Sequence, residues 1–304
     1  MAGKRGIIGE AFAVAATVAA IAVYAPSATA QSAPSGDLVA RGAYLANAGG
    51  CASCHTDTKA KGKPFAGGAG IKTPFGTFYP PNITSDPQHG IGKWTDADFI
   101  RALRDGKRPD GAHYFPAFPF TSYTQITDED MKAMRAWFAT VPAVAEPSKP
   151  NDIAFPFSWR FLQTGWKLLF FRSGAFEPDP SKSAEINRGA YLSNALAHCG
   201  ECHTPRNALG GLDGDMWMAG ANDGPEGERV PNITPDTETG LKWSASEIAD
   251  YLKSGLTPDG DFAGSLMADV ISHNTSKMTD ADLAAIAAYV KSLAPVKNRI
   301  GRKG

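Results

Sequence analysis

Residues 51–55 read Cys-Ala-Ser-Cys-His, and residues 199–203 read Cys-Gly-Glu-Cys-His. The two segments hold all four cysteines of the 304-residue chain. Each pair of cysteines is followed at once by a histidine, His55 in the first segment and His203 in the second. The chain has only six histidines, so one after both pairs is not expected by chance. The two segments are therefore the first candidates for a functional site.

The C-x-x-C-H spacing is the one through which a c-type haem is attached to protein. Two thiols add to the two vinyl groups of haem, and a tight helical turn sets the sulfurs at the vinyl separation. The next residue then directs its imidazole at the iron from the same side. We therefore predict two haem c groups, attached at Cys51, Cys54, Cys199 and Cys202, with His55 and His203 as iron ligands.

Two other uses of four cysteines have to be weighed. Four cysteines in an exported protein can form disulfides, and two C-x-x-C pairs can hold a structural zinc ion. Neither use explains the histidine that follows each pair. A thioredoxin-like redox pair requires a preceding strand in a βαβ unit, whereas Gly49-Gly50 and Ala197-His198 precede the pairs here. Haem attachment is the favoured interpretation.

The surroundings of the first segment recur around the second. Arg-Gly-Ala-Tyr-Leu precedes the cysteines at 41–45 and again at 188–192. Pro-Asn-Ile-Thr follows them at 81–84 and at 231–234, and a Lys-Trp pair and a Pro-Asp-Gly turn come after it in both halves. Such self-similarity indicates a duplicated structural unit.

Each half closes with a segment that is typical of a helix. Thr127 and Thr279 begin Thr-Asp-x-Asp segments, in which the threonine and the second aspartate can cap the free backbone N–H groups. Apolar residues then recur at helical spacing, while the alternation typical of strands is scarce throughout the chain. We predict an all-α fold, in which each half is a small domain wrapped around its haem. The apolar residues concerned are Met131, Met134, Trp137 and Phe138 in the first half and Leu283, Ile286, Ala287 and Val290 in the second.

The predicted domains cover 35–145 and 184–297, and a linker at 146–183 joins them. The ends of the linker are rich in proline and serine, but its middle is strongly aromatic. One interpretation is a contact with a partner or a membrane, and the other is a strap that packs against both domains and shields the haem edges. The strap is favoured, because a monomer seldom exposes so much apolar surface.

The start of the chain has the features of an export signal. Lys4 and Arg5 precede an apolar stretch, and Ala28-Thr29-Ala30 is a small-x-small cleavage site. The apolar stretch has about 15 residues, short of the roughly 20 that a membrane-spanning helix needs. We predict a signal peptide at 1–30 and a periplasmic protein, with an uncleaved membrane anchor as the alternative. The formal net charge of −1 gives no sign of a nucleic-acid partner.

The two halves differ at the position expected for a sixth iron ligand. When they are aligned on their Asp-Gly turns, Met267 falls opposite Phe118, which cannot bind iron. We predict Met267 as the axial ligand of the second haem, because methionine is a common sixth ligand in cytochromes c. His113 stands where the second half has Phe262 and is the candidate ligand of the first iron.

The chain resembles the periplasmic dihaem cytochromes c and the cytochrome subunits of membrane-bound alcohol, gluconate and fructose dehydrogenases. The resemblance covers nearly all of the chain after the signal and rests on both C-x-x-C-H motifs, both Pro-Asn-Ile-Thr segments, Gly-Ile-Gly-Lys-Trp at 90–94, and 114–120. It implies two tandem class I cytochrome c domains that take electrons from a dehydrogenase. The implied acceptor is a terminal oxidase, the quinone pool or another cytochrome. Those subunits carry three haems and typically a methionine in place of Phe118, so their partners cannot simply be transferred.

Two functions follow for such a chain. In the first, two six-coordinate haems carry electrons, from a haem of lower potential beside His113 to a haem of higher potential beside Met267. In the second, an open first haem acts on a small substrate, as in dihaem peroxidases and thiosulfate dehydrogenases. No acid–base group stands beside Phe118 in the sequence, which favours electron transfer. The expected partners are a dehydrogenase donor and a cytochrome or oxidase acceptor, with peripheral membrane association as a further option.

Overall fold

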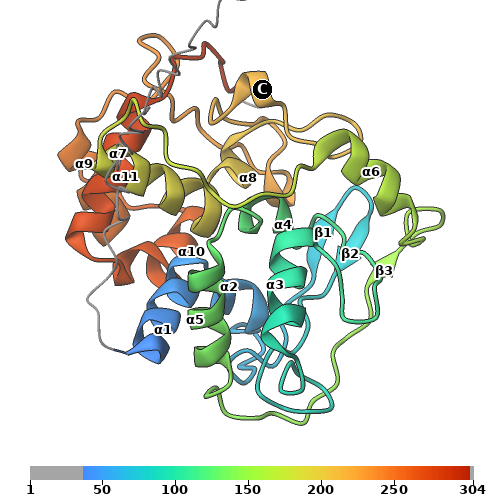
Figure 1. Ribbon diagram of the computed structural model, residues 1–304. Coiled ribbons are helices and arrows are strands. Elements are labelled where there is room, and N and C mark those ends of the chain that lie inside the picture. Colours follow the sequence, from blue (N-terminus) through green and yellow to red (C-terminus); the bar gives the residue numbers. More distant parts are fainter. Residues whose placement is uncertain (1–36, 302–304) are drawn as a thin grey trace, which may run out of the picture.

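The computed structural model describes residues 37–301, and the signal-peptide prediction lies outside them (Figure 1). The helices of the first half are α1 (Leu38–Ala48), α2 (Cys51–His55), α3 (Asp96–Asp105), α4 (Phe120–Tyr123) and α5 (Asp128–Phe138). Helix α6 (Leu162–Phe170) lies in the linker. The helices of the second half are α7 (Ala184–Tyr191), which continues as a π-helical turn to Leu196, α8 (Gly200–His203), α9 (Ala245–Ser254), α10 (Ser265–His273) and α11 (Asp280–Ser292).

In each half the first and last long helices cross at a glycine. A Cβ atom at Gly42 of α1 would overlap the carbonyl of Ala133 in α5. A Cβ atom at Gly189 of α7 would overlap the carbonyl of Ala285 in α11 in the same way. The glycine of each Arg-Gly-Ala-Tyr-Leu segment therefore allows the two helix backbones to touch, and the duplicated sequence produces a duplicated helix crossing.

The predicted helix starts and core faces are confirmed. The Thr127 hydroxyl accepts a hydrogen bond from the backbone N–H of Asp130, and Thr279 caps α11 through Asp282 in the same way. The apolar residues after these caps lie in the core. These are Met131, Met134 and Phe138 of α5 and Leu283, Ile286, Ala287 and Val290 of α11, while Trp137 packs at the edge of the core.

The all-α prediction holds for the core but misses a small antiparallel sheet. Strands β1 (Ile71–Thr73) and β2 (Gly76–Phe78) form a hairpin, and β3 (Asp152–Ile153) from the linker pairs with β2. Strands of two or three residues are too short to show an alternating pattern in the sequence. The sheet fixes the start of the linker to the first half.

The expectation that the linker packs against both halves is correct for only part of it. The Trp166 indole donates to the carbonyl of Leu209 in the second half (2.9 Å). The Lys167 ammonium donates to the carbonyls of Asp105 and Gly106 in the first half (2.6 and 2.9 Å). Other aromatic side chains of the linker lie in solvent, Phe155 among them. The segment is therefore a strap on one side and an exposed apolar surface on the other.

The two halves contact each other through a reciprocal pair of hydrogen bonds. The Tyr44 hydroxyl of the first half donates to Asp282 of the second (2.5 Å). The Tyr191 hydroxyl of the second half donates to Asp130 of the first (2.5 Å). We expected both aspartates to act as helix caps. Each instead binds the tyrosine of the other half and the arginine of its own Arg-Gly-Ala-Tyr-Leu segment.

We expect Asp282 to make the fold sensitive to acid. Burial raises the pKa of its carboxyl group, but hydrogen bonds from Arg188 and Tyr44 outweigh burial, so its pKa lies below the ordinary value. Such a group adds stability above its unfolded pKa of about 3.9, and this stability is lost as the pH falls through the lower folded value. The free energy of unfolding, measured with urea at a series of pH values below about 5, should therefore fall less steeply with decreasing pH in Asp282→Asn than in the unmodified chain.

The matched control for this measurement is Asp280→Asn. Asp280 lies two residues away on the same helix, and its side chain is almost fully exposed beside Lys253. Its replacement should leave the pH dependence unchanged, because exposed ion pairs contribute little. An acid-induced loss of stability that is equally steep in Asp282→Asn and in the unmodified chain would contradict the prediction.

Candidate functional site

Both C-x-x-C-H motifs fold as short helices that begin at a sharp turn of the chain. The first motif forms α2, and the second forms α8 from the residue after Cys199. The residue before the first cysteine has a left-handed backbone in both halves, with φ of 65° at Gly50 and 41° at His198. No disulfide joins any of these four cysteines, so all four are available to form thioethers with haem. Burial raises the pKa of Cys51 and Cys199 to about 12.

The two motif histidines are held in the state that an iron ligand requires. His55 Nδ1 lies 2.7 Å from the carbonyl oxygen of Pro81, and His203 Nδ1 lies 2.9 Å from that of Pro231. Since a carbonyl can only accept, Nδ1 donates, and Nε2 keeps its lone pair for a metal. Burial lowers the pKa of both imidazoles, partly offset by the bond to proline, so both are neutral as metal binding requires. The residues present therefore fit a haem iron in each half.

The Pro-Asn-Ile-Thr segments fix these proline carbonyls. In the first half the Asn82 side chain accepts from the backbone and the hydroxyl of Thr84 and donates to the Val144 carbonyl (2.8 Å). In the second half Asn232 makes the same contacts with Thr234 and the Val296 carbonyl. The buried asparagine thus ties the segment to the end of its domain and holds the adjacent proline in place. The sequence showed that this segment recurs but not what it does.

The segments expected to supply the sixth ligands differ between the halves. Met267 lies partly buried in the first turn of α10. Phe118 lies in an aromatic cluster, with its ring centroid 5.1 Å from that of Tyr114 and 5.6 Å from that of Tyr123. Burial raises the pKa of Tyr114 to about 12, so this phenol stays neutral. The first half therefore presents a packed aromatic surface where the second presents a methionine.

His113 is engaged with the linker. Its Nε2 lies 3.2 Å from the Thr164 hydroxyl of α6, and its carbonyl accepts from Arg160 (2.7 Å). Its Nδ1 is buried without a hydrogen-bond partner. The contact with Thr164 would have to break before Nε2 could bind iron. The assignments of His113 and Met267 as axial ligands stay predictions.

The two motifs approach each other at the contact between the halves. The Tyr123 hydroxyl donates to the Gly49 carbonyl beside the first motif (2.8 Å), and its ring packs edge-on against His198 beside the second. The Ser53 hydroxyl of the first motif donates to Asn274 of the second half (2.9 Å). His198 therefore lies between the two motifs, a position that its place in the sequence did not reveal.

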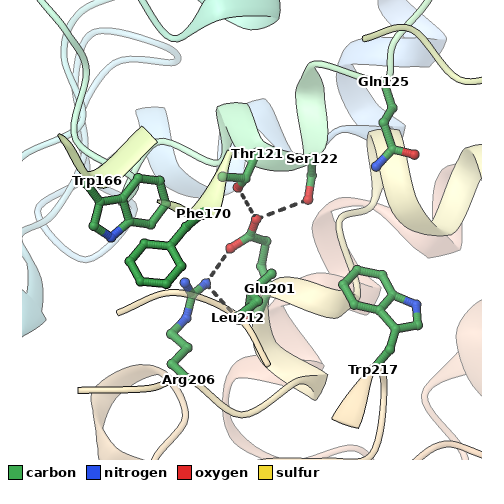
Figure 2. Close-up of a pocket in the computed structure, with 9 residues that line it drawn as sticks. All are labelled: Thr121, Ser122, Gln125, Trp166, Phe170, Glu201, Arg206, Leu212 and Trp217. Atoms are coloured by element: carbon green, nitrogen blue, oxygen red, sulfur yellow. Dashed lines mark hydrogen bonds and ion pairs between the residues drawn. The ribbon is translucent and has the colours of Figure 1, made fainter. Parts of the chain in front are cut away.

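The glutamate of the second motif reaches back to the first half (Figure 2). The Glu201 carboxylate accepts from Thr121 and Ser122 at the start of α4 and forms an ion pair with Arg206. These groups border a cavity of about 160 Å³, which Trp166 and Phe170 of the linker also line. Glu201 and Ser53 hold the same place in their motifs, so the middle of each motif is bound to the opposite half.

Two helical units, each with a C-x-x-C-H helix and a neutral, oriented imidazole, define a tandem c-type cytochrome. The family model described as cytochrome c matches residues 39–142 and, a second time, residues 186–294. The chain therefore belongs to the cytochrome c family. The repeated match agrees with the duplication in the sequence and in the helix crossings.

The relatives of the chain include a diheme cytochrome and the cytochrome subunits of dehydrogenases. It is 47% identical over 261 residues to a diheme cytochrome c-type protein of Cereibacter sphaeroides, covering 84% of this chain and 86% of that protein. It is 40% identical over 292 residues to the cytochrome c subunit of an alcohol dehydrogenase (quinone) of Gluconobacter oxydans, covering 93% of this chain and 60% of the subunit. The fructose dehydrogenase cytochrome subunit of Gluconobacter japonicus is 42% identical over 267 residues, 87% of this chain and 54% of that subunit. The chain thus spans little more than half the length of these dehydrogenase subunits.

Among residues 37–301, no helix has both the length and the apolar character needed to cross a membrane.

Proposed function

We propose that the protein is a dihaem c-type cytochrome that passes electrons from a periplasmic dehydrogenase to a respiratory acceptor. The observation that carries the proposal is the pair of oriented histidines, each with Nδ1 bonded to a proline carbonyl and Nε2 left free. A haem attached in each half would supply one-electron exchange at its iron. The chain's own residues hold each imidazole in one tautomer and bind the two motifs to each other. The names of the two dehydrogenase subunits among the relatives support a dehydrogenase as the donor.

The proposed organisation assigns one haem to each domain. Domain 1 covers 35–145 with the haem on Cys51 and Cys54, and domain 2 covers 184–297 with the haem on Cys199 and Cys202. The linker at 146–183 joins them, and residues 1–30 direct export to the periplasm. The repeated family match and the two crossings at Gly42 and Gly189 support this division.

The low-temperature EPR spectrum of the oxidised, purified protein tests the proposal. Two low-spin ferric signals, one of His/Met and one of bis-His type, are expected if Met267 and His113 complete the two iron sites. A high-spin signal from one haem would instead favour the enzyme hypothesis, with an open iron in the first half. The aromatic packing of Phe118 against Tyr114 and Tyr123 supports the closed site.

Replacing Met267 is expected to change one haem only. Met267→Ala should abolish the sulfur-to-iron charge-transfer band and lower one midpoint potential on the order of 0.1 V, within the range of about 0.8 V that axial ligands span. A redox titration followed by absorbance measures both. Met278→Leu is the matched control, because Met278 is a buried core methionine of the same half. A charge-transfer band that survives Met267→Ala would exclude Met267 as the ligand.

A further inference from the structure

Helix α6 buries a lysine and exposes two leucines, the reverse of what an ordinary surface helix does with these residue types. Lys167 is 8% exposed, with its ammonium bonded to two backbone carbonyls of the first half. The next two residues, Leu168 and Leu169, are 83% and 69% exposed. A surface helix normally turns its apolar stripe to the core and its charges to water. The exposed leucines of α6 therefore indicate a contact with a partner outside the chain.

An aromatic cluster continues this surface before α6. The ring centroids of Phe155 and Trp159 are 4.9 Å apart, and those of Trp159 and Phe161 are 5.4 Å apart, yet all three side chains are at least half exposed. We call the exposed apolar residues of the linker the linker patch. It comprises Phe155, Phe157, Trp159, Phe161, Leu162, Leu168 and Leu169. In Figure 1 the segment from β3 to α6 lies along the outer edge of the molecule.

The linker patch is fixed to the domain beneath it. The Arg160 guanidinium lies over the Phe115 ring, 4.5 Å from its centroid, and donates to the carbonyl of His113. Phe157 packs edge-on against Phe75 of the β1–β2 hairpin, with centroids 5.1 Å apart. The polar and hairpin-facing groups of the segment thus attach it to the protein. Its remaining aromatic and leucine side chains are presented outward on a rigid support.

The positive charge of the segment favours a negatively charged binding partner. Residues 153–176 contain three basic residues and no aspartate or glutamate. Arg160 and Lys167 are bound to carbonyls of the first half, so Arg172 supplies the charge that this segment offers to a partner. Arg172 is exposed just after α6, and Lys72 is exposed on β1 of the adjoining sheet. Tryptophan, phenylalanine and leucine beside basic residues are the composition of segments that lie in the interface of an anionic bilayer. A bilayer interface also accepts outward apolar side chains without a matching set of hydrogen bonds.

We propose that the linker patch inserts into the headgroup region of an anionic phospholipid bilayer and holds the protein on the membrane surface. The contact involves neither C-x-x-C-H motif, so it goes beyond the proposed electron transfer and does not depend on the identity of the donor. It would keep the cytochrome in a layer next to the membrane, with α6 lying in the plane of the interface.

Vesicle co-sedimentation of the mature holoprotein tests this proposal. Vesicles of phosphatidylglycerol and phosphatidylcholine should pellet the protein, measured by haem absorbance, and should shift its tryptophan fluorescence to the blue. Vesicles of phosphatidylcholine alone should bind it more weakly. The joint variant Leu168→Gln and Leu169→Gln is expected to lower the affinity for anionic vesicles about tenfold or more, and Arg172→Gln about fivefold at low salt.

The control is Leu38→Gln, which replaces another exposed leucine in α1, away from the linker. It should bind vesicles like the unmodified protein, and all variants should keep the haem spectrum and the EPR signals. Failure to pellet with anionic vesicles, or equal binding by the Leu168/Leu169 variant, would overturn the proposal. A dimer in solution that this variant dissociates would identify a second copy as the occupant and would also overturn it. None of these three outcomes would bear on the EPR test of electron transfer.

Discussion

A chain with both Cys199→Ala and Cys202→Ala is expected to carry one covalent haem in place of two. Each thioether requires a thiol, and the four motif cysteines are the only cysteines of the chain. The intact mass and the haem content per chain, measured by the pyridine haemochromogen assay, should both correspond to a single haem. The remaining haem should keep the spectrum of the first half.

The same substitutions should also destabilise the second half. A domain of about 110 residues buries too little apolar surface to have a large core of its own, and an attached haem would supply the missing apolar body. The mirrored variant, Cys51→Ala with Cys54→Ala, is the matched control and should retain the other haem. Two covalent haems in either double variant, or none in both, would contradict the assignment of one haem to each motif.

Asp130→Ala is expected to cost about 3 kcal/mol of the free energy of unfolding. The Asp130 side chain is 4% exposed and accepts from Arg41 and from the Tyr191 hydroxyl of the other half. Its removal leaves the arginine and the phenol without their partner. We place the cost at the low end of the range for broken buried pairs, because Arg41 is one-third exposed and can be partly hydrated. Urea unfolding at neutral pH, followed by circular dichroism, gives the value.

Asp128→Ala is the control for Asp130→Ala. Asp128 lies on the same turn of α5 and pairs with Arg104, but its side chain is 55% exposed. Its loss should cost less than about 1 kcal/mol. A double-mutant cycle with Tyr191→Phe should show that much of the Asp130 effect is shared with the tyrosine across the contact. Equal costs for Asp128→Ala and Asp130→Ala would show that the contact between the halves does not depend on the buried carboxylate.

The repeated segments allowed the helical part of the fold to be predicted. The Thr-Asp-x-Asp segments are local signals, and the Thr127 and Thr279 caps form where the sequence places them. The small sheet could not be predicted, because its strands are too short to have a pattern of their own, and its third strand comes from the linker. The favoured strap interpretation holds for Trp166 and Lys167 but not for the exposed linker patch. That interpretation assumed that apolar residues must be buried within the same chain.

The site was predictable to the extent that it is contained in a short motif. The C-x-x-C-H spacing identifies the attachment residues, but the proline carbonyls that orient His55 and His203 lie 26 and 28 residues away in the chain. The tyrosines that bind Asp130 and Asp282 lie in the opposite half. A signal for them was present, since Tyr44 and Tyr191 recur in both Arg-Gly-Ala-Tyr-Leu segments. Only the folded structure shows that each tyrosine binds an aspartate of the other half.

This exchange of tyrosines and aspartates has a consequence for the origin of the molecule. In an isologous dimer, residue i of one subunit meets residue j of its partner, and j of the first meets i of the second. Tyr44 with Asp282 and Tyr191 with Asp130 satisfy this rule within a single polypeptide. The arrangement is that of a homodimer whose subunits have been joined end to end. Such a joined dimer allows its two copies to differ, as Ser53 and Glu201 do at equivalent positions, while the reciprocal contact keeps the two copies in register.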